Sequence, residues 1–249
     1  MSTSGLPECF GVIPARYGST RFPGKPLALI RGKPMFWHVY TRAVHCPEIS
    51  RVVIATDDER IAVAARELDV PVIMTRSDHE SGTDRVHEAA TRLNTEPSEI
   101  IVNIQGDEPL LDPQMLSLLI RPFADPETSV TTLAHKMGFK SAQNPDRVKV
   151  AIAPDGRALY FSRAPIPHPR QKEDAEFFCH IGLYAFRRKA LDEFVRLGTG
   201  RLEKIEKLEQ LRLLENNIPI HVEVTENTSI SVDRPEDLRK VIDQINRKA

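Results

Sequence analysis

The sequence predicts an α/β fold with a mostly parallel sheet, and three observations support this. Short apolar runs of strand length alternate with amphipathic stretches over the first 128 residues. Polar turns follow the apolar runs, and the amphipathic stretches are long enough to be helices. This β-α-β-α order places helices on both faces of one sheet, whose ligand site is expected at the carboxyl ends of the strands.

The elements of this first part can be justified in chain order. The runs CFGVI, RVVIAT, PVIMT and EIIVNIQ predict strands at 9–13, 51–56, 71–75 and 99–105. Apolar spacing predicts helices at 35–46, 59–69, 83–93 and 113–123, where alanines favour the second helix and Ser81-Gly82-Thr83 forms a turn before the third. Asp57 is the expected N-cap of the second helix.

The order of elements changes after about residue 128. Strands are predicted at 129–136, within 148–162 as a pair joined by a Pro-Asp-Gly turn, at 177–187 and at 218–225. Helices are predicted at 189–197, 202–217 and 235–248. No Gly/Ser-rich linker divides the chain, so we expect one domain over 1–249 with a β-rich excursion at about 145–190. Such an excursion often carries substrate specificity or a dimer contact.

Composition excludes several classes of protein. The 249 residues carry a net charge of −1, which does not suit non-specific attraction to nucleic acid or to a membrane surface. Three widely spaced cysteines predict a reducing compartment rather than a disulfide framework or a zinc site. No signal peptide and no membrane span is visible, so a cytoplasmic location is expected.

The first loop, IPARYGSTRFPGKP at 13–26, concentrates positive charge. Arg16, Arg21 and Lys25 lie among glycines and prolines, and no acidic residue occurs between Cys9 and Pro47. Because the loop follows the first strand, its amides and cations are placed to bind phosphate oxygens. It matches neither the Walker A pattern nor GxGxxG. A solvated basic turn is the alternative interpretation.

Two acidic residues end later apolar stretches, a predicted strand before Asp107 and a short apolar stretch before Asp233. Asp107 stands in NIQGDEP at 103–109, and Asp233 stands in SISVDRPEDL at 229–238. If both lie over the end of the sheet, they are suitable ligands for Mg²⁺ beside a triphosphate. A turn at Asp107 and a helix cap at Asp233 are the structural alternatives.

Other polar positions are less specific. ATDDE at 55–59 and SGTDR at 81–85 follow strands and suit either base and ribose contacts or simple turns. His180 and Tyr184 share one face of a strand, where a hydrogen-bonded core histidine is the common outcome. Arg163 and Arg170 flank a proline-rich segment. One or both could bind a carboxylate, or each could be a surface arginine. Glu209 and Gln210 suit a charged helix face.

Taken together, these blocks resemble one family. IPARYGSTRFPGKPL, ATDDERI, SGTDR, VNIQGDEP, ALYFSRAPIP, HIGLYAFR, LEQLR and SVDRPEDL occur in the order found in 3-deoxy-manno-octulosonate cytidylyltransferases. These are the CMP-Kdo synthetases of lipopolysaccharide biosynthesis. The resemblance covers roughly residues 9 to 243, and the blocks after residue 158 favour the Kdo enzyme over its CMP-sialate relatives.

The resemblance implies a Rossmann-like fold of the nucleotide-diphospho-sugar transferase type and a homodimer with its contact near 145–190. It implies that CTP and Kdo are the substrates, that the 2-hydroxyl of Kdo attacks the α-phosphorus, and that pyrophosphate leaves. The implied Mg²⁺ ligands are Asp107 and Asp233, and the implied catalytic residues are these two with Arg16 and Lys25. The implied nucleotide-binding residues are Arg16, Ser19, Arg21, Lys25, Thr56, Asp57, Arg76, Ser81, Gly82 and Thr83. The implied sugar-binding residues are Gln105, Arg163, Arg170, His180, Tyr184, Glu209 and Gln210.

Three alternatives remain open from the sequence. The acceptor sugar is either Kdo or its 8-amino-3,8-dideoxy form, which differ at one terminal group. The acceptor is otherwise sialate or a sugar phosphate, as in other nucleotidylyltransferases. The third alternative is a non-catalytic nucleotide-binding regulator on the same fold, which would bind CTP without releasing pyrophosphate.

Overall fold

The computed structural model describes residues 5–18, 21–171 and 176–248, so the predicted site residue Ser19 lies outside the described residues. The chain divides into two compact units. We call Glu8–Ser117 with Ser229–Ala249 the parallel unit, and Leu118–Thr228 with the short segment before Glu8 the mixed unit. Each unit is described by itself below.

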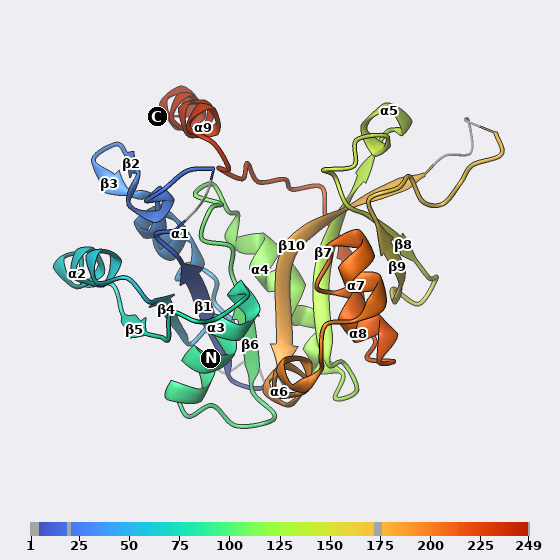
Figure 1. Ribbon diagram of the computed structural model, residues 1–249, viewed down its shortest axis with the longest axis horizontal. Helices are drawn as coiled ribbons and strands as arrows, with labels where there is room; N and C mark the ends of the chain where they lie inside the picture. The colour runs from blue at the N-terminus through green and yellow to red at the C-terminus, as the bar shows by residue number, and fades with distance from the viewer. Residues whose placement is uncertain (1–4, 19–20, 172–175, 249) are drawn as a thin grey trace. The chain divides into compact units, whose positions relative to one another are not determined.

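The parallel unit is built on four parallel strands in the order β6-β1-β4-β5 (Figure 1). Their bounds are Cys9–Ala15 for β1, Arg51–Thr56 for β4, Val72–Met74 for β5 and Ile100–Asn103 for β6. Val12 pairs with Val53 on one side and Asn103 on the other, and both valines are fully buried. Burial on both faces explains why these strands read as continuous apolar runs.

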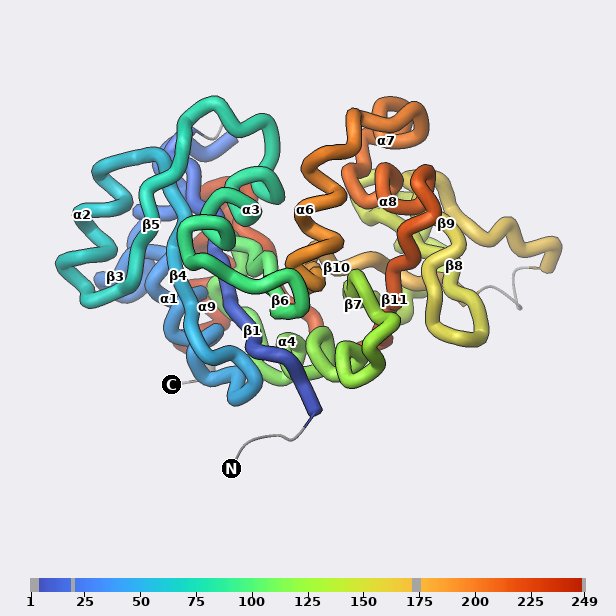
Figure 2. Tube along the Cα trace, turned by 90° about the horizontal axis from the view of Figure 1, so that it is seen from below, coloured from blue at the N-terminus to red at the C-terminus, as the bar shows by residue number. Residues whose placement is uncertain are grey.

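Helices α1, α2 and α3 follow strands of this sheet along the chain and α9 is the last element, and Figures 1 and 2 show these helices beside the sheet. Their bounds are Met35–Ala43 for α1, Glu59–Glu67 for α2, Gly82–Arg92 for α3 and Pro235–Lys248 for α9. The helix α4, Pro113–Ile120, continues into the 3₁₀ turn η2 at Arg121–Ala124. The prediction that Asp57 caps α2 is wrong: the cap is Asp58, whose carboxylate accepts from the Arg60 amide at 3.0 Å.

Short elements that the sequence did not reveal shape the basic loop. These are the 3₁₀ turn η1 at Lys25–Leu27 and a small hairpin of β2, Leu29–Ile30, with β3, Lys33–Pro34. Ile30 and Met35 are buried against Val232 and Val241 in one apolar cluster. This cluster joins the chain after the basic loop to the segment that carries Asp233 and to α9.

The described residues of the mixed unit form five strands, and β7 lies between β10 and β11. Their bounds are Val130–Met137 for β7, Lys149–Ile152 for β8, Ala158–Ser162 for β9, Phe177–Arg187 for β10 and His221–Val224 for β11. Strand β7 is parallel to β11 and antiparallel to β10, while β8 is antiparallel to both β10 and β9. The predicted turn between β8 and β9 is present, with Gly156 at a φ of 85°.

One expected helix of the mixed unit is broken. The unit's helices are α5 at Phe139–Ala142, α6 at Arg188–Arg196, α7 at Arg201–Glu206 and α8 at Leu211–Glu215. The predicted helix at 202–217 is interrupted at Lys207, which adopts a left-handed conformation with a φ of 55°. Arg212 donates to both carboxylate oxygens of Glu203, at 2.6 and 2.8 Å, and ties the two short helices together. The break leaves Gln210 buried at the start of α8.

The predicted α/β class, with a mostly parallel sheet and a β-rich excursion, is confirmed. All three cysteines are free and buried. Over the described part of the chain, no helix combines the length and the apolar character that crossing a membrane requires.

Candidate active site

Two cations of the basic loop meet the two predicted acids, Asp107 and Asp233, at one point of the parallel unit. The Lys25 ammonium donates to Oδ2 of Asp107 at 2.8 Å and lies 3.7 Å from Oδ1 of Asp233. Arg21 reaches the same Asp233 carboxylate with both terminal nitrogens, at 3.1 and 3.2 Å. Two carboxylates from distant parts of the chain therefore converge on one cation. The prediction that Asp107 and Asp233 approach each other agrees with this geometry.

Local backbone geometry places Lys25 and Asp107. Gly24 has a φ of 70°, its amide donates to the carbonyl of Tyr17 at 2.9 Å, and its Cα faces the Tyr17 ring so closely that a Cβ would lie 3.1 Å from it. Gly106 packs against β1, where a Cβ would lie 2.8 Å from the Pro14 carbonyl oxygen. A side chain at either position would displace the residue that follows it.

Arg16 directly follows β1 and has spare donor capacity. Its side chain is half-buried, and Nη1 makes a long contact of 3.5 Å with the carbonyl of Glu80. Its Nη2 is buried and has no hydrogen-bond partner among the residues that the structure describes. Buried donors are normally paired. An anionic ligand would supply the missing acceptor.

Glu108, which the sequence analysis did not select, is buried next to Asp107. Burial, with a contribution from the Asp107 charge, raises the pKa of Glu108 to about 7. Its Oε2 is among the buried atoms without a hydrogen-bond partner in the described residues. Glu108 is therefore largely uncharged below pH 7, so at lower pH it adds little negative charge beside Asp107.

The two polar turns of the parallel unit are ordered by their own hydrogen bonds. Thr56 is fully buried, and its hydroxyl accepts from the Asp58 amide at 3.2 Å. The Ser81 hydroxyl accepts from the Asp84 amide at 3.1 Å, and the Asp84 carboxylate accepts from the Ser81 amide, so the pair forms a capping box at α3. Gly82 and Thr83 open the helix, where Thr83 is buried. The Ser81 side chain therefore has a structural role independent of any ligand.

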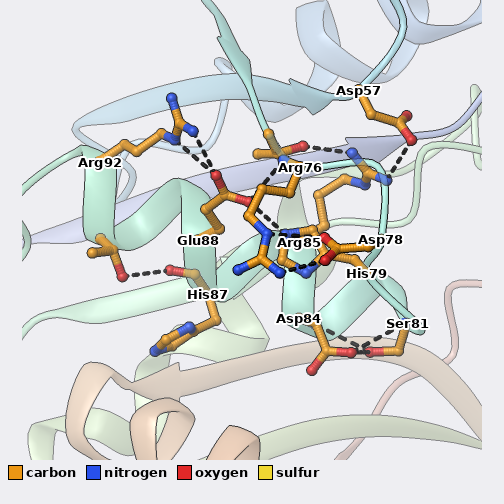
Figure 3. Close-up of polar contacts among 12 residues, drawn as sticks. Asp57, Arg76, Asp78, His79, Ser81, Asp84, Arg85, His87, Glu88 and Arg92 are labelled. Carbon is orange, nitrogen blue, oxygen red and sulfur yellow. Dashed lines mark hydrogen bonds and ion pairs between the residues drawn. The ribbon is translucent and has the colours of Figure 1, made fainter.

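Arg76 is at the surface. Its guanidinium pairs with both carboxylate oxygens of Asp78, and both side chains are largely exposed. Its backbone amide donates to Glu88 at 2.9 Å. Figure 3 shows the Arg76 side chain directed at Asp78. A ligand would have to compete with this ion pair for the guanidinium.

His180 and Tyr184 lie together on β10 in the mixed unit. The ring of His180 packs against Phe161 and Tyr184, and its Nε2 lies 3.0 Å from the Thr132 hydroxyl. Burial lowers the pKa of His180 to about 3. Burial also raises the pKa of Tyr184, whose hydroxyl has Thr132 nearby but no well-formed hydrogen bond within the described residues. Both side chains are therefore neutral near pH 7.

Gln210 and Glu209 occupy the turn before α8. Gln210 is 8% exposed, and its Nε2 is buried without a hydrogen-bond partner in the described part of the chain. Glu209 is exposed, and its charge raises the pKa of Tyr184 after the larger effect of burial. Gln105, in the parallel unit, is half-buried and follows β6. In the mixed unit, the neutral Tyr184 hydroxyl is therefore close enough to the exposed Glu209 carboxylate to feel its charge.

The two predicted arginines of the proline-rich segment differ. Arg163 is anchored, since its guanidinium donates to the carbonyls of Glu206, Pro145 and Lys207 at 2.8, 3.1 and 3.4 Å. Arg170 is exposed. The carbonyl of Arg163 in turn accepts from Lys149, a fully buried lysine of β8. Arg163 thus helps to hold its own segment in place, whereas Arg170 is open to a ligand.

Arg85 and Lys149 are the buried cations that the sequence analysis missed. Both are fully buried, and burial lowers the pKa of each. In the sequence, Arg85 stands in the SGTDR turn and Lys149 stands within a predicted strand. The signal available was a charged residue within an otherwise apolar pattern, which a surface position explains equally well.

The donor set at Asp107 and Asp233 fits Mg²⁺. The described residues contain no cluster of three or more His, Cys, Asp or Glu side chains that would form a complete protein cage for a metal ion. Two aspartates around one cation match the way Mg²⁺ is held by one or two carboxylates, with water and substrate phosphates as its other ligands. The Lys25 ammonium lies between the two carboxylates, at a position where their negative charges favour a cation.

With this geometry established, comparisons with known proteins define the class. The family model for cytidylyltransferases matches residues 10–224. The chain belongs to the cytidylyltransferase family.

Its relatives make the assignment more specific. It is 58% identical to the 3-deoxy-manno-octulosonate cytidylyltransferase of Oleidesulfovibrio alaskensis, across 95% of this chain and 96% of that one. Identity is 57% with the protein of the same name from Nitratidesulfovibrio vulgaris, across 94% of each chain. The predicted membership of the 3-deoxy-manno-octulosonate cytidylyltransferases is confirmed.

Solved structures agree with the predicted fold type. A CMP:2-keto-3-deoxy-manno-octonic acid synthetase complexed with CTP matches with a TM-score of 0.93 at 41% identity, covering 97% of this chain and 100% of that chain. A cytidylyltransferase from Leptospira borgpetersenii matches with a TM-score of 0.65 at 17% identity, covering 97% of this chain and 87% of that chain, which shows the shared fold alone. The nucleotide-diphospho-sugar transferase type of fold is therefore confirmed.

Proposed function

We propose that this protein transfers CMP from CTP to the 2-hydroxyl of 3-deoxy-D-manno-octulosonate, giving CMP-Kdo and pyrophosphate. The observation that carries the proposal is the meeting of Lys25, Asp107 and Asp233, three residues that the family resemblance had assigned to the triphosphate and its metal. The 58% identical relative bears the name of this activity, and a similar structure holds CTP.

Charge and geometry support CTP binding in the parallel unit. Arg16, Arg21 and Lys25 supply cationic donors, and Arg16 retains a buried donor without a partner in the described residues. In the transfer, negative charge passes to the leaving pyrophosphate, and fixed cations stabilise that charge as it develops. When CTP binds, we expect Lys25 to exchange its aspartate partner for a phosphate oxygen.

We propose that Asp107 and Asp233 hold Mg²⁺. When bound, Mg²⁺ would screen the triphosphate and lower the pKa of the attacking sugar hydroxyl. The two aspartates would fix the position of the ion, and the neighbouring Glu108, whose pKa burial raises to about 7, would stay largely uncharged at lower pH. Because charge neutralisation and alignment provide the catalysis, no side chain of this site has to act as a strong general base.

We propose that the mixed unit binds the sugar. Tyr184 and Gln210 present buried polar atoms that lack well-formed hydrogen bonds within the described residues, and such atoms suit the hydroxyls of a sugar. The exposed Arg170 suits its carboxylate. His180 is held neutral by burial and is placed to orient rather than to transfer a proton.

We also propose a homodimer that acts in the cytoplasm, in lipopolysaccharide biosynthesis. The mixed unit exposes Leu159 on β9 and Ile205 on α7, at 62% and 66%, and apolar side chains of this kind are suited to an interface with a second copy. The reducing environment of the cytoplasm suits three free cysteines.

A pyrophosphate-release assay tests the proposed reaction. The purified protein is given CTP, Mg²⁺ and one acceptor at a time: Kdo, its 8-amino-3,8-dideoxy form, sialate, or none. We expect release with CTP and Kdo, and much less with ATP, GTP or UTP. A higher kcat/KM for the 8-amino sugar or for sialate would transfer the assignment to that acceptor. CTP binding without pyrophosphate release for any acceptor would support the non-catalytic regulator and contradict the proposal.

A further inference from the structure

Arg85 is a buried arginine at the carboxyl end of the parallel sheet. Its side chain is fully buried on α3, with Nη2 3.1 Å from Oδ2 of Asp57, and its Nη1 donates to the Thr75 hydroxyl. Its Nε has no hydrogen-bond partner in the described residues. Figure 3 shows the Arg85 side chain extended from the helix to Asp57. Moving a guanidinium out of water costs free energy, and the contacts with Asp57 and Thr75 must offset that cost.

The contacts of Arg85 join three separate elements. Asp57 directly follows β4, Thr75 directly follows β5, and Arg85 lies one turn into α3. The Thr75 amide also donates to the Thr56 carbonyl at 2.8 Å, which extends the pairing of the two strands past their ends. Arg85 thus fixes the point where two strands open into loops, which is the edge at which α/β sheets bind ligands.

Glu88, one turn further along α3, holds the following loop from the other side. It accepts from the Arg76 amide, from His79 and from Arg92. Burial opposes its ionisation, but these donors outweigh burial and lower the pKa of Glu88 to about 2. Because Arg85 and Glu88 are three residues apart, they share one face of α3. This face holds the loop between β5 and α3 at its start, Thr75 and Arg76, and at His79. Asp57, Arg76 and Ser81 are among the nucleotide-binding residues that the family resemblance implies.

We propose that Arg85 is a positioning residue for nucleotide selection: by fixing Asp57 and Thr75, it sets the shape of the surface that contacts the base and ribose of CTP. This rests on the proposed function. A role in stability alone explains the arrangement less well, because a buried ion pair adds little net stability over a well-packed apolar side chain. Arg85, Asp57 and Thr75 meet at the edge of the sheet. An apolar side chain in place of Arg85 would be enough for the fold alone.

Three variants test this role. Arg85→Met keeps the length and removes the charge, Arg85→Lys keeps the charge without the planar fork, and Thr75→Val removes one anchor and retains the shape. The control is Arg187→Met, in the mixed unit, since Arg187 is a half-buried arginine that donates to the carbonyls of Phe123, Asp125 and Thr128. For each protein, Tm, CTP affinity by titration, the KM for CTP, the KM for Kdo, and the ratio of kcat/KM for CTP to that for UTP are measured.

We expect Arg85→Met to raise the KM for CTP roughly ten-fold and to lower the CTP-to-UTP ratio, while the KM for Kdo changes little. Thr75→Val should show the same pattern more weakly, and Arg85→Lys should recover part of the loss. Arg187→Met should lower Tm without changing nucleotide selection.

The inference is overturned if Arg85→Lys and Thr75→Val, which should fold even where Arg85→Met does not, leave the KM for CTP and the CTP-to-UTP ratio at wild-type values. Failure of the proposed function looks different, because the wild-type protein would then release no pyrophosphate from CTP and Kdo. In that case CTP titration still tests the inference. The Thr75→Val protein should bind CTP more weakly than wild type. Equal affinity of the two proteins for CTP would overturn the inference.

Discussion

The two units prepare polar groups for ligands in different ways. In the parallel unit, Lys25, Asp107 and Asp233 are charged, partly exposed and paired with one another. In the mixed unit, Gln210 is buried and His180 and Tyr184 are half-buried, and burial keeps the histidine and the tyrosine neutral. A ligand of the first site must exchange existing ion pairs. A ligand of the second site can supply hydrogen bonds that the protein lacks.

This difference suits two kinds of substrate. A triphosphate carries enough charge to replace the ion pairs of the parallel unit, and a metal ion can take the place of the lysine between the aspartates. A sugar is recognised by its hydroxyls, and buried polar groups strongly reject an analogue that leaves them unpaired. Selectivity for the acceptor is therefore expected to depend on the mixed unit, and charge neutralisation on the parallel unit.

The largest expected effect is at Asp107. Asp107→Asn keeps the shape of the side chain and removes the charge that would hold Mg²⁺, so kcat should fall by on the order of 100-fold. The fold should be retained, because Asp107 is partly exposed and its partner Lys25 can still pair with Asp233. Pyrophosphate release and thermal unfolding measure the two effects. Near-normal kcat at saturating Mg²⁺ would remove Asp107 from the metal site.

A smaller effect, confined to the sugar, is expected at Gln210. Gln210→Met removes the buried Nε2, so kcat/KM for Kdo should fall roughly ten-fold, while Tm stays equal or rises because an unpaired buried group is lost. The matched control is Gln143→Met, since Gln143 is exposed at the end of α5. A lower Tm with unchanged kcat/KM for Kdo would show that Gln210 serves packing alone.

The smallest effect concerns stability against pH. The folded pKa of His180 is about 3, below its ordinary value of 6.5, so the unfolded chain binds the extra proton between these pH values. The contribution of His180 to stability is therefore fully present above pH 6.5 and declines as pH falls toward 3. We expect His180→Gln to have a flatter dependence of unfolding free energy on pH between about 6.5 and 4, measured by urea denaturation. Equal slopes for the two proteins would mean that His180 is solvated.

Much of the parallel unit could be predicted from the sequence, because strands buried on both faces read as apolar runs and their carboxyl ends share one edge. The position of Asp107 at the end of β6 follows from that topology, whereas Asp233 directly follows no strand among the described residues and its place beside Asp107 was implied by the family resemblance. The choice between Asp57 and Asp58 as the helix cap could not be predicted, because adjacent aspartates suit the position equally. The two-residue strands β2 and β3 are too short to show any periodicity.

The mixed unit was less predictable in detail. The break at Lys207 was missed because lysine favours helix, and only the tertiary pair of Glu203 with Arg212 shows why α7 and α8 are separate. The anchoring of Arg163 to backbone carbonyls leaves no pattern in the sequence. Buried cations such as Arg85 look like surface residues until their partners are known. Ser19 stays a prediction, since it lies outside the described residues.

The most direct test of the central claim is the ratio of CTP affinity in Mg²⁺ to that in EDTA, measured by titration calorimetry. The claim is that the parallel unit binds CTP through metal and cations, and that the buried groups of the mixed unit recognise the sugar. Wild type and Gln210→Met should show the same large ratio, agreeing within about two-fold. Asp107→Asn should show a ratio near one. A full Mg²⁺ effect in Asp107→Asn, or its loss in Gln210→Met, would contradict the account.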